Sequence, residues 1–439
     1  MAEATPPRLK IAIIGAGIGG LTAAIAFLRH APHIEIQIYE QATSLRAIGA
    51  SIALGPNGLR TLEKLGVHNA LEPEIAFRGP SGKPMIYRHW KTNEILSVDE
   101  HQNVSDWKHR TARFHRAHLQ EALLQHVPPE KISLRKRARD VTVSDENVRV
   151  EFEDGDVIEV DILLGADGIH SKVRKNFAPE HQLNWTGWVP FRSVFDASLV
   201  EGIEDLPEDS THWWGPDRNL FASRLGKNIF CIVGGYNDDP KNPDAIYKDA
   251  KWDGEGDINL LREYYKDWHP VIQKLVQATP STRLHPNVSG SALPTWIFHE
   301  RVTLIGDAAH THGGAFAAGG SLAIDDAYAF YLAVSSAFPS GSAFTDKPTT
   351  QDIGRALRVY EKTRLPHVTK VLDMVRDQML KKQLNGTAPG VGADEADDQL
   401  RKRAGGRADP SWIHEHNVEE SFRAVLRDDA RDELVPARL

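Results

Sequence analysis

The chain has 439 residues, of which 41% are hydrophobic and 26% charged, and a formal net charge of −8 at pH 7. This length predicts two or three packed layers in two lobes, and the negative charge argues against a nucleic-acid partner. A single cysteine, Cys231, excludes an internal disulfide and fits a reducing compartment, so we expect a cytoplasmic protein.

The N-terminal elements predict a βαβ unit. Leu9 to Ile14 is an apolar run typical of an interior parallel strand, Ile18 to Arg29 reads as a helix, and Ile34 to Glu40 alternates as a second strand. The uncharged segment Ile11 to Leu28 has the length of a membrane span. Its glycines are spaced as in a nucleotide-binding turn, however, so we predict a buried strand and helix and no membrane span.

The middle of the chain predicts further helices and a change of character. Pro56 to Leu65 and His115 to His126 read as helices, and Val148 to Phe152 and Val157 to Leu164 as strands joined by an Asp-Gly turn. Residues 183–296 hold seven of the ten tryptophans, many turn residues and short β-prone runs. We predict that they form a mainly β-sheet lobe.

The C-terminal third returns to alternating strand and helix patterns. Val302 to Ile305 reads as a strand, Gly320 to Ser336 as a helix, and Asp352 to Leu384 as a helix broken before Pro366. Residues 385–439 are predicted to be a mobile loop followed by a C-terminal tail.

The first chemical signal is a dinucleotide fingerprint. Gly15, Gly17 and Gly20 follow a strand and open a helix, where they allow a tight turn, approach of backbone amides to a pyrophosphate, and close helix packing. Glu40 lies twenty residues beyond Gly20 at the end of the second strand, where its carboxylate can accept hydrogen bonds from a ribose. The fingerprint itself does not separate FAD from NAD.

Two later turns extend this site. Asp167 and Gly168 follow one apolar strand, and Asp307 follows another. A carboxylate in such a turn can bind the hydroxyl groups of a ribityl chain or cap a helix. Two acidic turns in this order favour one long cofactor held at three distant points. His310 and His312 lie two residues apart but have no carboxylate or thiol at ligand spacing, so we predict no metal.

These motifs together resemble a known family. The sequences GAGIGG from Gly15, His115-Arg116, GADGIHSKVR from Gly165 and GDAAH from Gly306 are similar to those of the single-component FAD-dependent aromatic hydroxylases, in the branch of salicylate and hydroxybenzoate hydroxylases. The tail from Asp409 to His416 also resembles the ending of that branch. The motifs span most of the chain, whereas the middle lobe matches only in general pattern.

The resemblance implies an α/β fold with a discontinuous FAD-binding domain. This Rossmann-like domain, a parallel sheet with helices, comprises residues 1–182 and 297–384 and includes C-terminal helices. A mainly β-sheet substrate domain, residues 183–296, is inserted into it. The protein is expected to be a monomer or homodimer that binds FAD without a covalent bond and uses NADH or NADPH as co-substrate.

The resemblance also implies roles for individual residues. Glu40 binds the adenosine ribose, Arg116 lies near the pyrophosphate, and Asp307 binds the ribityl and phosphate region. The Asp167-Gly168 turn and Arg174 are associated in this family with both FAD and NAD(P)H. The complete set of predicted cofactor-binding residues is Gly15, Gly17, Gly20, Glu40, Arg46, Ala50, Arg116, Asp167, Gly168, Asp307, Gly319 and Gly320.

The implied reaction is hydroxylation of a phenolic or hydroxybenzoate-like ring by O₂ through a flavin hydroperoxide, with loss of CO₂ if attack occurs at a carbon that bears a carboxylate. Arg192 is predicted to stabilise negative charge on this small aromatic substrate, and His312 to assist ionisation of the phenol. Residues expected to line the substrate pocket are His212, Trp214, Phe221, Arg224, Tyr236 and Phe316.

One departure from the family pattern concerns the segment after GDAAH. Gly314 stands where the family has a proline, and Ala317 replaces the first glycine of a Gly-x-Gly pair. That proline shapes the backbone beside the oxygen-reacting edge of the flavin. Its absence puts the geometry of the pocket in question, and Phe316 is expected to fill the space.

Two other functions stay open. The scaffold also hosts flavin-dependent oxidases, epoxidases and halogenases, although the segment Trp185 to Trp188 does not match the halogenase pattern Trp-x-Trp-x-Ile. A flavin-fold protein that binds a partner without catalysis is the third reading. Glu40, Asp167 and Asp307 argue against it, because a binding module need not keep the flavin contacts.

Overall fold

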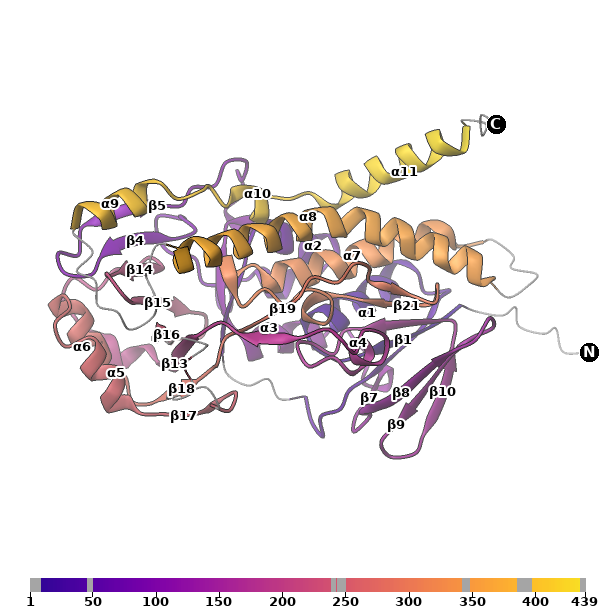
Figure 1. The fold of residues 1–439 in the computed structure, drawn as a ribbon, viewed down its shortest axis with the longest axis horizontal. Helices are drawn as coiled ribbons and strands as arrows, with labels where there is room; N and C mark the ends of the chain where they lie inside the picture. Colours follow the sequence, from indigo (N-terminus) through magenta and orange to yellow (C-terminus); the bar gives the residue numbers. More distant parts are fainter. Residues whose placement is uncertain are drawn as a thin grey trace, which may run out of the picture.

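The computed structural model describes residues 9–45, 50–237, 242, 250–341, 348–384 and 397–434. Within these residues the chain is an α/β protein with two hydrophobic cores, one around a mainly parallel sheet and the other against a mainly antiparallel sheet (Figure 1). None of the helices in the described ranges is long and apolar enough to cross a membrane.

The parallel sheet forms the centre of the first lobe. Its order in the described chain is β20-β21-β11-β1-β2-β7, and only the β20–β21 pair is antiparallel. Ile13 stands opposite Ile38 and Leu164, and all three are fully buried because both faces of the sheet are covered. The strands are β1 Lys10–Ile14, β2 Glu35–Tyr39, β7 Ile132–Ser133, β11 Ile162–Gly165, β20 Ile297–Phe298 and β21 Val302–Leu304.

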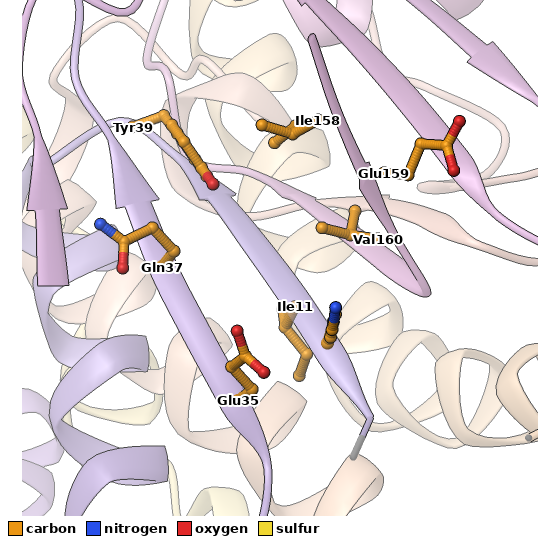
Figure 2. A pocket seen from close by; sticks show the side chains of 8 residues that line it. Ile11, Glu35, Gln37, Tyr39, Ile158, Glu159 and Val160 are labelled. Carbon is orange, nitrogen blue, oxygen red and sulfur yellow. The ribbon is translucent and has the colours of Figure 1, made fainter. Parts of the chain in front are cut away.

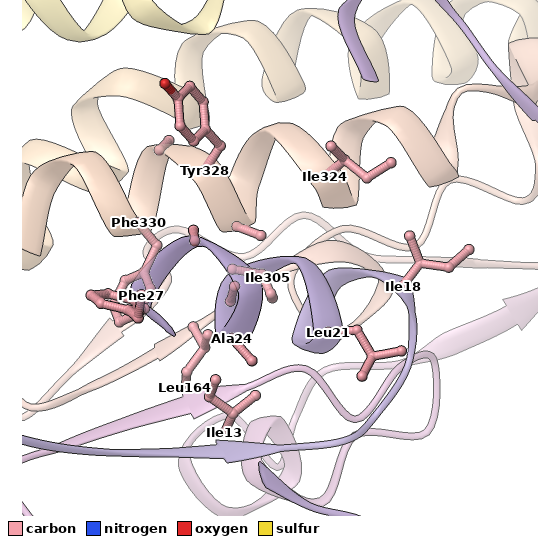
Figure 3. Close-up of a cluster of buried hydrophobic side chains, with 14 of the residues drawn as sticks. Ile13, Ile18, Leu21, Ala24, Phe27, Leu164, Ile305, Ile324, Tyr328 and Phe330 are labelled. Carbon is pink, nitrogen blue, oxygen red and sulfur yellow. The ribbon is translucent and has the colours of Figure 1, made fainter. Parts of the chain in front are cut away.

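Helix α1 (Ile18–His30) is packed between this sheet and helix α7 (Gly319–Ala337), and Figure 3 shows the apolar side chains at that contact. The ring of Phe27 meets the rings of Phe330 and Tyr331 edge-on, with centroids 5.7 Å and 5.5 Å away. These contacts hold the C-terminal part of α1 against α7.

The predicted strand Val157 to Leu164 is two strands in two sheets. β10 (Val157–Val160) pairs antiparallel with β9 (Val148–Phe152), which pairs with β8 (Ala138–Val143), whereas β11 joins the parallel sheet. Between them, the carboxylate of Asp161 accepts a hydrogen bond of 2.8 Å from the backbone N–H of Lys10. The chain changes sheets there, which an apolar run cannot reveal.

The second lobe is built on an antiparallel sheet of order β17-β18-β13-β16-β15-β14-β4-β5 within the described residues. Only β14 and β4 are parallel. β4 (Ile86–His89) and β5 (Ile95–Val98) form one edge of this sheet. Both strands precede residue 183, the predicted start of the β-sheet lobe, so the sheet includes strands from an earlier segment of the chain. The other strands are β13 Trp188–Asp196, β14 Thr211–Trp214, β15 Asn219–Leu225, β16 Ile229–Asn237, β17 Gly254–Gly256 and β18 Thr282–Leu284.

One face of the antiparallel sheet packs on helices α5 (Ile258–Tyr264) and α6 (Pro270–Ala278). Phe191, Trp213 and Ile232 are fully buried on this face. The side chains that alternate with them point to the opposite face, since successive side chains of a strand point to opposite sides. That opposite face is therefore free of the α5–α6 core.

Shorter elements complete the fold, and the helices among them contribute buried side chains to the core of the first lobe. They are the pairs β3 (Ser51–Leu54) with β6 (Ala112–His115) and β12 (Leu183–Trp185) with β19 (Val288–Gly290), and the helices α2 Pro56–Lys64, α3 Arg116–Leu124 and α4 Lys172–Phe177. The 3-10 turns are η1 His68–Leu71, η2 Trp107–His109, η3 Pro129–Lys131, η4 Ala197–Val200, η5 Gly306–Ala308 and η6 Ala315–Ala317.

Helix α8 (Thr350–Leu384) continues through Pro366, so the predicted break is wrong. Pro366 is exposed, while Arg364 and Val368 on either side are buried. A proline inside a helix removes one backbone hydrogen bond. Packing of the buried face holds the helix together across that position.

The C-terminal segment, residues 397–434, forms helices that lie along both lobes (Figure 1). They are α9 Asp397–Gly405, α10 Ser411–His414 and α11 Val418–Leu434. Arg407 pairs with Asp99 at 3.0 Å, and the Glu415 carboxylate accepts backbone N–H bonds from Gln102 and Asn103. The predicted loop from 385 to 396 lies outside the described residues; the tail beyond it is helical.

His414 of α10 links this segment to acid stability. It is half-buried beside Gly55, and its Nδ1 is buried without a hydrogen-bond partner among the described residues. Burial, with smaller contributions from Arg113 and His101, lowers the pKa of His414 from 6.5 to about 4. Below pH 6.5 the unfolded chain therefore takes up a proton here that the folded chain refuses, and stability is lost as pH falls toward 4.

The free energy of unfolding should fall between pH 6.5 and pH 5, and we expect this fall to be smaller in His414→Gln by roughly 1.5 kcal/mol. The measurement is the free energy of unfolding in urea at both pH values. His68→Gln, at an exposed position, serves as the control. An unchanged difference between the two pH values in His414→Gln would contradict the burial argument.

Candidate functional site

The glycine turn lies at the carboxyl end of β1, where two of its glycines have no space for a side chain. Gly15 has φ +109°, and a Cβ there would lie 2.4 Å from the carbonyl oxygen of Ala166. A Cβ on Gly20 would lie 2.0 Å from the carbonyl oxygen of Gly15. By contrast, no atom lies within 4 Å of a Cβ built on Gly17. The turn is thus closed toward the protein and open at Gly17, as approach of a pyrophosphate requires.

Glu40 is held beside this turn. Its Oε2 accepts a hydrogen bond of 2.8 Å from the backbone N–H of Ala16, and its Oε1 accepts one of 2.8 Å from Ala42. Gln120 of α3 donates to the carbonyl oxygen of Ala16 at 2.9 Å. A half-exposed carboxylate with spare acceptor capacity therefore stands next to the turn at the end of β2.

Ala50 and Arg116 are brought together although 66 positions separate them in the sequence. The backbone N–H of Arg116, the first residue of α3, donates to the carbonyl oxygen of Ala50 at 2.8 Å. The Arg116 side chain is exposed. Arg46 lies outside the described residues.

Asp167 uses its carboxylate within its own turn. It accepts hydrogen bonds from the Ser171 hydroxyl at 2.5 Å and from the backbone N–H groups of Lys172 and Val173 at 2.6 Å and 3.2 Å. Burial raises its pKa, and these hydrogen bonds oppose that shift. Gly168 follows with φ +74°. The carboxylate thus shapes the start of α4, which is the capping role that the turn pattern left open.

Arg174 of α4 is buried and binds backbone carbonyls. It donates to the carbonyl oxygens of Asp307 and Ala308 at 3.1 Å and 2.9 Å, and to that of Ile169. The residue therefore fixes the turn that carries Asp307. A surface charge on α4 is excluded as its role.

Asp307 is the exposed residue of a buried turn. Gly306, Ala308, Ala309 and His310 around it are all buried. This turn follows β21, whose neighbour β11 leads to the Asp167 turn, so both turns lie at the carboxyl ends of adjacent parallel strands. Ligands of open α/β sheets bind at such ends.

The loop from Gly313 to Ala317 has an unusual backbone. Gly313 and Gly314 have φ +67° and +68°, and Phe316 and Ala317 also take positive values, +56° and +52°. Proline is locked near −65° and cannot adopt the conformation of Gly314. This loop therefore departs from a proline-shaped path, and it stores strain at Phe316 and Ala317, as functional sites often do.

The loop leads into α7, whose first residues are Gly319 and Gly320. A Cβ on Gly320 would lie 2.9 Å from the side chains of Ile52 and Leu54, and one on Gly319 would lie 3.4 Å from the ring of His312. No side chain caps this helix end. Its free N–H groups can meet a negatively charged or polar group.

Arg192 of β13 is half-buried, and its charge has no partner among the described residues. Its Nε is buried and has no hydrogen-bond acceptor among the described residues, and no carboxylate there pairs with it. Register places Arg192 opposite Val233, and Phe221 pairs with the same Val233 from β15. Arg192 and Phe221 therefore share the face that is free of the α5–α6 core.

The other predicted pocket residues fall into different positions. His212 pairs with Phe221 and shares its face, as does Trp214, which lies under the guanidinium groups of Arg403 and Arg407 at 5.0 Å and 5.5 Å. Arg224 pairs with Phe230, a core residue on the α5–α6 side, so its assignment to the pocket is corrected. Tyr236 pairs with Val189, and its side chain lies outside the described part of the structure.

His312 is buried, and neither ring nitrogen has a hydrogen-bond partner in the described chain. Burial lowers its pKa, although the nearby Asp307 opposes that shift. An isolated antiparallel backbone bridge joins His312 to Ser289 of β19. This strand lies in the segment that runs from the antiparallel sheet back to the first lobe. A neutral imidazole with free nitrogens can accept a proton.

Two features of the site were not predicted. His285 is buried and follows β18 on the Arg192 side of the sheet, and nothing in its sequence context marks it. Asp326 is fully buried and bonds to the Asp307 turn through His310. Two adjacent acids, Asp325 and Asp326, inside an otherwise apolar helical run were a signal that could have identified it.

A pocket of about 250 Å³ lies elsewhere, between β1, β2 and β10 (Figure 2). It contains none of the predicted site residues, so it is not the candidate site. The residues that line it are Lys10, Ile11, Glu35, Gln37, Tyr39, Ile158, Glu159 and Val160. Across the described residues no group of three metal-ligating side chains forms a metal site.

Comparison with known proteins gives a consistent result. The chain is 28% identical over 380 residues to 6-hydroxynicotinate 3-monooxygenase of Bordetella bronchiseptica, covering 84% of this chain and 91% of that protein. It is 26% identical over 409 residues to a salicylate hydroxylase of Pseudomonas putida, covering 90% and 89%. No family model matches.

Solved structures share the fold. A salicylate hydroxylase substrate complex aligns with a TM-score of 0.74 at 22% identity, over 95% of this chain and 98% of that one. Klebsiella pneumoniae HpxO complexed with FAD and uric acid aligns with a TM-score of 0.70 at 22% identity, over 97% and 99%.

The glycine turn generates a paired prediction. Gly20→Ala forces a Cβ against backbone and is expected to destabilise the protein by about 1–3 kcal/mol. Gly17→Ala meets open space, so stability is expected to stay unchanged while FAD affinity falls roughly tenfold to a hundredfold. Thermal unfolding of the FAD-free proteins and FAD titration measure the two effects. Equal FAD affinity of Gly17→Ala and the unchanged protein would contradict the assignment.

Proposed function

We propose that the chain is an FAD-dependent aromatic monooxygenase of the single-component class, which hydroxylates a phenolic or hydroxybenzoate-like ring with NADH or NADPH and O₂. Its relatives hydroxylate hydroxynicotinate, salicylate and related rings, and the neighbouring structures contain FAD. The observation that carries the substrate class is the half-buried guanidinium of Arg192, whose buried Nε has no hydrogen-bond partner among the described residues.

The residues at the carboxyl ends of β1, β2 and β21 fit FAD. We assign the pyrophosphate to the open side of Gly17, with Arg116 nearby, and the adenosine ribose to Glu40. The exposed carboxylate of Asp307 fits the ribityl and phosphate region. The open space at Gly17 and the free N–H groups at Gly319 support these assignments. When bound, FAD supplies electron transfer from the nicotinamide and activation of O₂.

We assign the cofactor to the lobe of residues 1–182 and 297–384 and the substrate to the face of the antiparallel sheet that carries Arg192. That sheet extends the predicted substrate lobe, residues 183–296, by β4 and β5. The Asp167 turn has a shaping role in this assignment rather than direct contact with the ribityl chain.

Arg192 stabilises the anionic form of the substrate. Burying a guanidinium costs free energy unless an anion pairs with it, and no protein carboxylate among the described residues does so. A phenolate or ring carboxylate supplies the missing partner. Because negative charge on the ring raises its nucleophilicity, pairing with Arg192 must hold the anion without removing its reactivity.

His312 accepts the proton of the substrate hydroxyl. The O–H bond breaks, the proton moves to a free ring nitrogen of His312, and the electron pair stays on the substrate oxygen. Burial keeps the imidazole neutral before this transfer because it lowers the pKa of His312. The exposed Asp307 carboxylate nearby then stabilises the imidazolium.

A substrate panel tests the proposed function. The purified protein is expected to be yellow and to oxidise NADH or NADPH faster with salicylate, 4-hydroxybenzoate or 6-hydroxynicotinate than without a ring, with matching O₂ uptake. Mass spectrometry should show one added oxygen and reveal any loss of CO₂. Absence of stimulation by every phenol in a broad panel would overturn the hydroxylase proposal and favour an oxidase or epoxidase.

Arg192→Gln is expected to lower kcat/KM for the anionic substrate roughly 30- to 1000-fold, which corresponds to about 2–4 kcal/mol of lost stabilisation. Steady-state NADH oxidation measures it. Arg224→Gln, two strands away on the opposite face, should change kcat/KM less than about threefold. Similar losses in both variants would contradict the face assignment.

A further inference from the structure

We propose that Asp326 is a positioning residue for the cofactor, because its carboxylate fixes the turn of residues 306–310 and thereby the outward-pointing Asp307. This inference rests on the FAD site assigned above. It goes beyond that site because Asp326 is fully buried in helix α7 and is not among the predicted FAD contacts.

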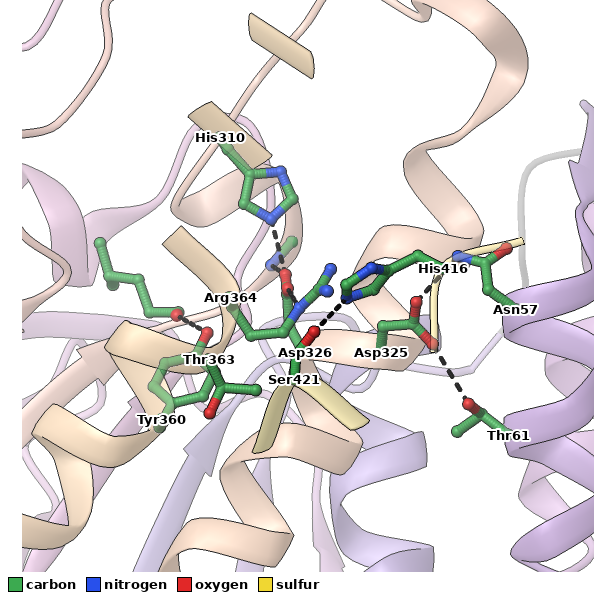
Figure 4. Close-up of polar contacts among 12 residues, drawn as sticks. Asn57, Thr61, His310, Asp325, Asp326, Tyr360, Thr363, Arg364, His416 and Ser421 are labelled. Atoms are coloured by element: carbon green, nitrogen blue, oxygen red, sulfur yellow. Dashed lines mark hydrogen bonds and ion pairs between the residues drawn. The ribbon is translucent and has the colours of Figure 1, made fainter. Parts of the chain in front are cut away.

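Both ends of the turn are bonded to one oxygen atom. The backbone N–H of Gly306 donates to Oδ2 of Asp326 at 2.9 Å, and Nε2 of His310 lies 2.6 Å from the same Oδ2 (Figure 4). Gly306 has φ +58°, so the chain turns sharply at this point. A single carboxylate oxygen thus closes the turn from Gly306 to His310.

The other carboxylate oxygen anchors the turn to helix α8. Nε of Arg364 donates to Oδ1 of Asp326 at 2.8 Å, and both side chains are completely buried. Burial alone would raise the pKa of Asp326, but His310 and Arg364 outweigh that effect and hold it at about 2. The carboxylate is therefore charged at every working pH and keeps all three bonds.

Arg174 holds the same turn from its carbonyl side. It donates to the carbonyl oxygens of Asp307 and Ala308. A buried anion thus binds the donors of the turn and a buried cation binds its acceptors. Asp307 is the side chain left exposed between them, so movement of the turn changes the position of that carboxylate.

The neighbouring Asp325 provides a matched control. It is equally buried in the same helix, but its carboxylate accepts hydrogen bonds from Asn57 at 2.8 Å and Thr61 at 3.1 Å, both in α2. Burial raises the pKa of Asp325 to about 6. Loss of either carboxylate removes buried hydrogen bonds, but only loss of Asp326 releases the Asp307 turn.

The experiment compares FAD dissociation from the holoenzymes of Asp326→Asn and Asp325→Asn, measured by the rise in flavin fluorescence on serial dilution. We expect the Kd for FAD to rise 10- to 100-fold in Asp326→Asn, with a changed flavin absorbance spectrum, and less than threefold in Asp325→Asn. Equal Kd values for the two variants would overturn the proposal. His310→Ala removes one donor but keeps the Arg364 pair, and an unchanged Kd in that variant would overturn it even if Asp326→Asn does not fold.

A double-mutant cycle separates positioning from a general loss of stability. If Asp326 acts through Asp307, the effect of Asp326→Asn on the Kd should fall to less than threefold in an Asp307→Asn background. The same fold-change in both backgrounds would overturn the positioning role. Two negative results remain distinguishable. If the wild-type protein retains no FAD, the cofactor assignment itself is overturned. If the wild type and Asp326→Asn bind FAD equally, only the positioning role is overturned.

Discussion

Close approach of backbone to backbone at the carboxyl end of β1 is the constraint on which the site depends. At Gly20 a side chain would meet the carbonyl oxygen of Gly15, and at Gly15 it would meet that of Ala166. This approach joins three segments, β1, α1 and the Asp167 turn, without side chains between them. Backbone N–H groups can then face a phosphate directly, and the Asp307 turn lies at the end of the same sheet, two strands away.

Each lobe supplies one surface of the assigned site, the first for the cofactor and the second for the substrate. The parallel sheet presents its turns, and the antiparallel sheet presents the face that carries Arg192, while α5 and α6 cover the opposite face with a core. The C-terminal segment spans both, through Arg407 on Asp99 and Asp429 on Lys362 of α8. An FAD-dependent monooxygenase needs its cofactor and ring substrate to meet between such surfaces, away from water.

Buried charges in this protein serve geometry as much as chemistry. Asp167 and Arg174 resembled ligand contacts in the sequence, yet their hydrogen bonds go to groups of the turns they stabilise, mostly to the backbone. Arg192 differs because no protein group among the described residues satisfies it. A charged group whose hydrogen bonds are made within the protein shapes the site, whereas one without protein partners is a candidate to bind a ligand.

The sequence by itself determined the βαβ unit and a long cofactor held at three turns, because glycine spacing and acidic turns are local patterns with a physical meaning. The resemblance of its motifs to a known family added FAD and the monooxygenase class. Only the tertiary structure decided which side chains share a face. The run from Val157 to Leu164 contains a change of sheet at Asp161, Pro366 lies within a continuous helix, and Arg224 points away from Arg192. Each of these outcomes depends on strand register or packing against distant segments, and neither is encoded in neighbouring residues.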